Sequence, residues 1–180
     1  MMTFRWMGGA LLGLALLGAT VDAAFAQVAR NELLSESVTV SGEGLAGFTI
    51  DASSLSDLPR LTIEEARTLS GGAVAESRST LTGVLLRDAL DRAGLTKLDR
   101  FTARRLYFVA SATDGYQAVF SWAELYNSAT GDGVLIVVER NGKPLPADEG
   151  HYALVSLADK RPGPRHVKWL NRVRVFRTFE

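Results

Sequence analysis

The feature of this sequence with the clearest chemical potential is a run of basic residues close to its carboxyl end. Between positions 160 and 177 there are seven lysine and arginine side chains and no acidic one: Lys160, Arg161, Arg165, Lys168, Arg172, Arg174 and Arg177. Arginine offers a planar fork that can hold an oxyanion through two hydrogen bonds, and lysine offers a compact charge. The run therefore predicts either an anion-binding site or a solvated, salt-bridged face that complements the acidic remainder of the chain.

Several other chemistries are excluded by what the sequence lacks. There is no cysteine, so there can be no disulfide, thiolate nucleophile or iron–sulfur cluster. The two histidines, His151 and His166, lie outside any zinc-binding motif, which argues for surface or packed roles. Glu64 and Glu65 are adjacent, so a strand would point them to opposite faces and weaken an acid–base pair. No G-x-S-x-G or phosphate-binding loop is present, and the basic run is too short to predict nucleic-acid binding.

The first 26 residues have the composition of a secretory signal peptide. Arg5 supplies a positive start, residues 6–21 are uncharged and dominated by glycine, alanine and leucine, and residues 24–26 form an A-x-A cleavage site. The apolar run is shorter than the roughly 20 residues of a spanning helix, which argues against retention as a membrane anchor. We therefore expect cleavage after Ala26, a single mature domain over residues 27–180, a periplasmic or secreted location, and no membrane association after cleavage.

The elements that must position these residues are mostly short strands. With 47% hydrophobic and 22% charged residues, the composition is that of a globular domain. Hairpins are predicted where β-branched and aromatic runs flank glycine-rich turns. The expected strands are 37–40 and 48–50, 61–66 and 73–80, 106–112 and 116–121, 134–138, 152–157 and 173–176. Asp114-Gly115 and Asn141-Gly142 supply two of the turns, while residues 55–58 and 122–126 suit single helical turns.

One segment has clear helical periodicity. Leu86, Leu90 and Ala93 lie four and then three positions apart, which predicts a helix over residues 84–93. Thr82 is the expected N-cap, and Gly94 is the expected stop. Many short strands with one main helix favour a compact mixed domain of the α+β class.

Four segments resemble one known family in matching order. Arg165-His-Val-Lys-Trp-Leu-Asn-Arg-Val173 resembles the R-x-V-K-W-L-x-R-[IV] stretch in the molybdopterin-binding domain of the sulfite oxidase family. Residues 81–90 are similar to the family's t-G-v-p-L-r-D-l-L helix start. Residues 112–116 resemble its A-x-D-G-Y hairpin, and residues 141–145 resemble its n-G-k-P-L turn. The resemblance implies the sulfite-oxidase type of molybdopterin-binding fold.

The resemblance also implies a cofactor site. In the family, basic residues of the R-x-V-K-W motif contact the phosphate of the pterin, a role that falls here on Arg165 and Lys168, with Arg161 and His166 as neighbours. Gly163 would permit close backbone approach. Arg172 and Arg174 alternate with valines, so we expect them on the solvated side of a strand.

The metal ligand of the family is missing. Its molybdenum is held by two dithiolene sulfurs and one cysteine thiolate upstream of the helix start, whereas the corresponding residues 63–79 contain no cysteine. A carboxylate or hydroxyl does not substitute for a soft thiolate without changing the metal's electronics. The single-arginine signal peptide also indicates export of an unfolded chain, which would arrive without cofactor. No metal site is therefore predicted, although the resemblance keeps molybdopterin as a candidate ligand.

Two hypotheses on function follow. The first is a periplasmic or secreted module, built on the molybdopterin-binding fold without its metal ligand, that binds an anionic small molecule or a periplasmic protein partner. The alternative is a molybdopterin-dependent oxidoreductase, transferring oxygen atoms as in sulfite oxidases, with an unusual metal ligand set. The sequence does not decide whether the protein is an enzyme.

Overall fold

The computed structural model describes residues 32–68, 76–160 and 163–178, and the predicted signal peptide and Arg161 lie outside them. The strands are β1 (Val38–Gly42), β2 (Phe48–Ile50), β3 (Arg60–Thr68), β4 (Glu76–Leu85), β5 (Leu106–Ala112), β6 (Gln117–Ser121), β7 (Val134–Arg140), β8 (Lys143–Pro144), β9 (Ala153–Ser156) and β10 (Leu170–Arg177). The helices are α2 (Leu86–Arg92), α3 (Arg100–Ala103) and α4 (Trp122–Tyr126), with 3₁₀ turns η1 (Ser54–Asp57), η2 (Leu95–Lys97) and η3 (Ala129–Gly133).

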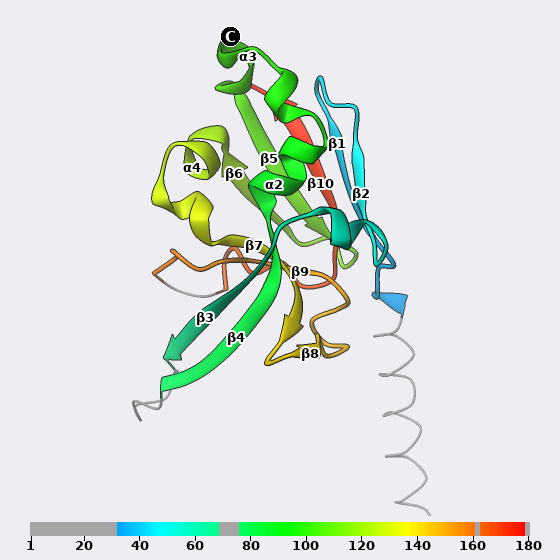
Figure 1. Cartoon of the computed structure of the whole chain (residues 1–180), viewed down its shortest axis with the longest axis vertical. Coiled ribbons are helices and arrows are strands. Elements are labelled where there is room, and N and C mark those ends of the chain that lie inside the picture. The colour runs from blue at the N-terminus through cyan, green and yellow to red at the C-terminus, as the bar shows by residue number, and fades with distance from the viewer. Residues whose placement is uncertain (1–31, 69–75, 161–162, 179–180) are drawn as a thin grey trace, which may run out of the picture. The chain divides into compact units, whose positions relative to one another are not determined.

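The strands form two sheets. The first has the order β2-β1-β10-β5-β6, and the second has the order β3-β4-β7-β8 with β9 also paired to β7. All strand pairs are antiparallel except β1 with β10, which run parallel with Val40 opposite Val173. Figure 1 shows β3 and β4 extending as a long ribbon, while α2 lies against the first sheet. This sheet-rich architecture with few helices confirms the predicted α+β class.

Strand β7 joins the two hydrophobic cores because both of its faces are buried. Val134 and Ile136 pack in the larger core with the inner face of the first sheet and with α2. Leu135 and Val137, on the other face, pack in a smaller core of the second sheet. The sequence predicted a strand at residues 134–138, which the structure confirms, and its near-continuous apolar run suits burial on both sides.

The main helix begins two residues later than its periodicity predicted. Strand β4 continues through Leu85, and Thr82 lies inside it opposite Glu139, so the prediction of Thr82 as the N-cap was wrong. A bulge follows Thr82, and a Cβ on Gly83 would lie 2.1 Å from the carbonyl oxygen of Ile136. This close approach holds the segment in the sheet. The helix ends as predicted, because Gly94 adopts a φ of +113°.

The predicted hairpins are present, and one short helix was missed. Strands β1 and β2, β3 and β4, and β5 and β6 each form an antiparallel pair. At the turns, Asn141 and Gly142 both have positive φ, as the Asn-Gly pair predicted. Helix α3 was not predicted from the sequence; its first turn is capped by Asp99 through hydrogen bonds from the N–H groups of Phe101 and Thr102.

Candidate functional site

The segment that carries the predicted site residues, 163–169, contains an isolated β-bridge at Val167 and leads directly into β10. Gly163 accepts a hydrogen bond from the backbone N–H of His166 at 2.9 Å, which closes a turn. Val167 is buried and exchanges two backbone hydrogen bonds of 2.8 Å with Leu154 of β9. Trp169 then adopts a φ of +49° immediately before β10. The positions of Arg165, His166 and Lys168 are therefore fixed by backbone contacts on both sides.

A shallow groove of about 240 Å³ brings this segment together with the β5–β6 hairpin. Its lining residues are Asp114, Tyr116, Gly163, His166, Lys168 and Trp169. The hydroxyl of Tyr116 donates to the carbonyl oxygen of Pro164 at 2.8 Å, and the N–H of Thr113 donates to the carbonyl of Trp169 at 3.0 Å. The D-G-Y and H-V-K-W motifs, far apart in the sequence, thus form the two walls of one groove.

Among the basic residues of this groove, Lys168 has the charge that nearby carboxylates neutralise least. Its side chain is 40% exposed, and its Nζ lies 3.9 Å from Oδ2 of Asp148, which is itself 60% exposed. An ion pair this long and this exposed contributes little and exchanges readily with water or another anion. Lys168 can therefore turn its charge toward a ligand in the groove.

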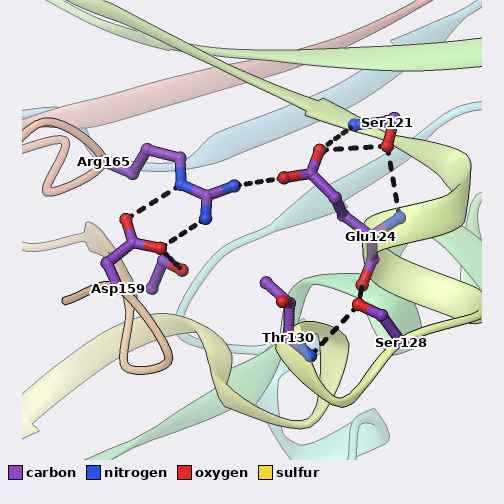
Figure 2. A network of polar contacts seen from close by, with 7 residues as sticks. Ser121, Glu124, Ser128, Thr130, Asp159 and Arg165 are labelled. Carbon is purple, nitrogen blue, oxygen red and sulfur yellow. Dashed lines mark hydrogen bonds and ion pairs between the residues drawn. The ribbon is translucent and has the colours of Figure 1, made fainter.

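Arg165 lies in a very different environment (Figure 2). Its Nε donates to Oδ2 of Asp159 at 2.9 Å, its Nη2 donates to Oδ1 of the same carboxylate, and its Nη1 donates to Glu124 at 2.7 Å. The guanidinium carbon also lies 4.9 Å from the centroid of the Phe120 ring. Each nitrogen of the guanidinium already has a carboxylate partner, so an incoming anion would have to displace one of them.

The pKa values of this network shift in the directions expected for a stable set of charges. The guanidinium of Arg165 lowers the pKa of Asp159, which also accepts a hydrogen bond from the Ser156 hydroxyl. Burial acts to raise the pKa of Glu124, but the N–H and hydroxyl of Ser121 and the Arg165 guanidinium together lower it. Both carboxylates are therefore ionised at neutral pH, and together they more than neutralise Arg165.

Arg140 forms a second charge network on the other side of His166. Its Nη1 donates to Glu65 at 2.9 Å and to the Ser79 hydroxyl at 3.1 Å, and its Nη2 donates to Glu149 at 3.0 Å. These carboxylate side chains are only 9% and 11% exposed. The Nε2 atom of His166 is buried 3.5 Å from Oε2 of Glu149, within ion-pair range but without a hydrogen-bond partner. A polar cavity of about 20 Å³, enough for one water molecule, separates His166 from Glu65 and Asp159.

This second network stabilises the ionised form of the Glu149 side chain. The imidazole of His166, and then the Arg140 guanidinium, lower the pKa of Glu149 to about 2, against the opposing effect of burial. The backbone carbonyl of Glu149 also accepts the N–H of Trp169 at 2.8 Å. The network therefore connects the β3–β4 ribbon to the wall of the groove.

The indole of Trp169 completes that wall. Its Nε1 donates to the carbonyl oxygen of Ala147 at 2.9 Å, and a Cβ on Gly150 would lie 2.8 Å from both Cα and Cδ1 of Trp169. Gly150 also has a φ of +88°, so glycine is required on two counts. The ring is half-buried and its position is set by a backbone that leaves it little freedom.

The structure separates the predicted residues into three groups. His166 and Lys168 lie in the groove, and Arg165 lies in the carboxylate network beside the small cavity. Arg172 and Arg174 are exposed while Val173 and Val175 are buried, as the alternation predicted. The charged residues around these positions were not predicted from the sequence; they are Glu65, Glu124, Arg140, Glu149 and Asp159. Only Glu124 had a readable signal, because Ser121 and Glu124 have the spacing of a capping box, which the structure contains.

Comparison with solved structures supports the fold. The chain matches the sulfane dehydrogenase SoxCD from Paracoccus pantotrophus with a TM-score of 0.58 and 17% sequence identity. The match covers 79% of this chain and 39% of the SoxCD chain, so it spans less than half of that protein. At this identity the likeness establishes the fold alone.

A family model gives the assignment. Residues 38–179 match the oxidoreductase molybdopterin binding domain, which covers well over half of the chain. The protein therefore belongs to the oxidoreductase molybdopterin-binding domain family, as the four sequence motifs indicated. Comparison with the curated proteins finds no match.

Proposed function

We propose that this protein is an exported member of the family that binds a phosphate-bearing heterocyclic small molecule in the groove and does not carry out molybdenum chemistry. The observation that carries the proposal is the convergence of the D-G-Y hairpin and the H-V-K-W segment on one groove that contains an incompletely neutralised lysine. Grooves with a few convergent polar groups and aromatic walls are typical ligand sites.

The donor atoms of the chain do not fit the metal of the family. The sequence offers no thiolate, and no group of three or more His, Asp or Glu residues among the described positions is arranged to hold a metal ion. In the stretch where the resemblance places the cysteine, Glu65 and Ser79 are both bonded to Arg140. The positive Arg140 guanidinium beside these two oxygens would repel a metal cation bound by them. The residues therefore favour a metal-free site.

The polar groups of the groove fit an anion joined to a flat, hydrogen-bonding ring. Lys168 attracts the anionic end of such a ligand, whereas the Asp114 carboxylate repels it and accepts N–H groups instead. Tyr116, 44% exposed, and Trp169 add aromatic surface to the walls of the same groove. A phosphorylated pterin has this combination of groups, and so does a guanine nucleotide, whose pyrimidine ring carries the same amino and oxo substituents.

Calorimetric titration with guanosine monophosphate, guanosine and inorganic phosphate tests this proposal. We expect the nucleotide to bind most tightly, because only it uses both ends of the groove. Lys168→Ala should weaken nucleotide binding about tenfold, since a charge-assisted hydrogen bond contributes about 1.5 kcal/mol or more. Arg174→Ala is the matched control and should change the affinity little. Absence of nucleotide binding by the unmodified protein, or equal losses in both variants, would contradict the proposal.

Elemental analysis distinguishes the alternative of a molybdenum oxidoreductase. We expect protein from a molybdenum-replete host to contain far less than one molybdenum atom per chain. Near-stoichiometric molybdenum, with a pterin released on denaturation, would favour the alternative function with an unusual ligand set.

The proposed location is the periplasm or the exterior of the cell, with the mature chain beginning at Gln27. The support for this is the sequence of the first 26 residues. Intact-mass analysis of the exported protein tests it, and a chain that keeps Met1 and sediments with membranes would overturn it.

A further inference from the structure

The end of the first sheet that lies away from the groove carries a basic aromatic tip. Here β5 begins and β10 ends, and the N–H of Thr178 donates to the carbonyl of Arg105 at 2.9 Å. The groove is at the opposite ends of the same two strands, next to Ala112 and Leu170. Helix α3 lies at the upper end of this sheet in Figure 1. We define the basic aromatic tip as Lys97, Arg100, Phe101, Arg104 and Arg105.

Phe101 is the most exposed large hydrophobic side chain of the tip and of the described chain. It is 75% exposed, whereas Ala103 on the same short helix is 6% exposed and Leu106 is 2% exposed. The Asp99 carboxylate accepts the N–H groups of Phe101 and Thr102 at 3.0 and 3.1 Å, which fixes the first turn. The ring is therefore held outward by a defined local structure, with the other side of the helix anchored in the domain.

The charges around this ring are largely of one sign. The other four members of the tip are exposed cations, and Asp99, which caps α3, is the one acidic residue between positions 97 and 105. Within the part of the chain that the structure describes, Lys97, Arg100 and Arg104 form no ion pair. An exposed apolar ring beside Lys97, Arg100 and Arg104 suits a surface that offers negative charge at its boundary and an apolar medium just beneath it.

We propose that the basic aromatic tip docks the folded domain onto an anionic lipid bilayer, with Phe101 entering the headgroup region and the arginines contacting lipid phosphates. A protein partner of acidic character would match the charge, but a standard protein interface buries about 800 Å² on each side. One helical turn with a single apolar side chain is a small anchor for such an interface. A bilayer deforms around the ring and needs no complementary pocket.

This proposal differs from the expectation of no membrane association after signal cleavage. That expectation rested on the lengths of apolar runs, which report only on spanning segments, and no helix among the described residues is long and apolar enough to span. The basic aromatic tip forms only when the domain folds, and its residues do not make a continuous apolar run in the sequence. Docking through α3 would leave the groove at the other end of β10 accessible to its ligand.

Vesicle co-sedimentation tests the proposal with the protein as it is recovered in soluble form. The probes are phosphatidylglycerol vesicles, with phosphatidylcholine vesicles as the neutral reference. We expect binding to the anionic vesicles that is about tenfold stronger or more than to the neutral ones and that weakens with salt. Inorganic phosphate at matched ionic strength should not compete, which separates a bilayer surface from a site for the free ion.

Two variants and one matched control decide whether the tip is responsible. Phe101→Ser should lower the partition coefficient about tenfold, and the double change Arg100→Glu with Arg104→Glu should lower it about a hundredfold or more. Arg172→Glu with Arg174→Glu makes the same change of charge on the outer face of β10 and should retain most of the binding. Circular dichroism and thermal unfolding confirm that each variant is folded.

Three results would overturn the proposal. The first is the absence of binding to anionic vesicles by the unmodified protein. That result would favour an acidic protein as the partner that binds the tip. The second is an equal loss for both charge reversals, which would indicate diffuse attraction to net charge. The third is full binding by Phe101→Ser together with the arginine double variant.

Discussion

Arg165 and Lys168 come from the same short segment and resemble the same family motif, yet the structure gives them opposite surroundings. Arg165 meets two carboxylates that more than neutralise it, whereas Lys168 has one distant, exposed partner. A cation surrounded by carboxylates stabilises the fold, and a cation left without them is available to a ligand. The partners of a basic residue, more than its place in a motif, therefore decide whether it stabilises the fold or is available to bind a ligand.

The largest expected effect comes from removing the neutralised cation. Arg165→Met would leave Asp159 and Glu124 facing one another without a counter-charge, with side chains that are 16% and 39% exposed. Breaking a fully buried pair costs about 3 to 5 kcal/mol, and the partial exposure here reduces our expectation to about 2 kcal/mol of unfolding free energy.

Urea unfolding measures this loss, and Lys168→Met is the matched control. The control should lie within about 0.5 kcal/mol of the unmodified protein, because its side chain is exposed and loosely paired. If both variants lose the same stability, the contrast between the two cations is contradicted. The double variant Arg165→Met with Asp159→Asn tests the ion pair directly. Its loss of unfolding free energy should be smaller than the sum of the losses in the two single variants.

A second prediction concerns the pH dependence contributed by Glu149. Its pKa is lowered from the ordinary 4.5 to about 2, so the folded state binds its proton less readily than the unfolded state. The stabilisation is therefore complete above about pH 4.5 and is lost progressively as the pH falls toward about 2. Glu149→Gln should lower the unfolding free energy by about 1 to 2 kcal/mol at neutral pH and flatten its decline below about pH 4.5.

Urea unfolding at a series of pH values provides this measurement. Glu139→Gln serves as the control, because its carboxylate pairs with Arg60 on an exposed surface where the two side chains are 34% and 45% exposed. An unchanged slope in Glu149→Gln would show that the Arg140 network does not set the acid sensitivity of the fold.

The smallest expected effect concerns the link between the two walls of the groove. Tyr116→Phe removes the hydroxyl that donates to Pro164 and should lower the unfolding free energy by about 1 kcal/mol or less. Amide hydrogen exchange should speed up for Gly163, Arg165 and His166 while the exchange in β7 stays unchanged. Equal acceleration in both places would mean that the hydroxyl supports the whole fold and not the groove in particular.

Local patterns in the sequence were sufficient for most of the sheet structure. Asp114-Gly115 and Asn141-Gly142 predicted their turns because few residues tolerate the backbone angles required, and the apolar run at residues 134–138 predicted strand β7. The start of α2 was predicted too early because Thr82 suits an N-cap by residue type. Its actual role depends on Gly83 lying against Ile136, a contact with another strand that local sequence does not encode.

The candidate site was predictable only in part for the same reason. The motifs identified the cations, but the carboxylates that neutralise Arg165 lie outside those motifs. Glu124 follows β6 and lies 41 positions before Arg165, whereas Asp159 follows β9 and lies six positions before it. The composition shows how many acidic residues the chain has. Only the fold determines which of them contacts Arg165.

The parallel pairing of β1 with β10 has a consequence for how the domain is made. The first strand of the described chain finds its partner in the last one, and the Ser35 hydroxyl reaches the carbonyl of Leu170 across 135 positions of sequence. Contacts between such distant residues carry a high entropic cost of loop closure and slow the folding of a domain. Until β10 is available, the centre of the first sheet is missing and β1 has only the short β2 beside it. The first sheet of such a chain can therefore be completed only after its last strand is available.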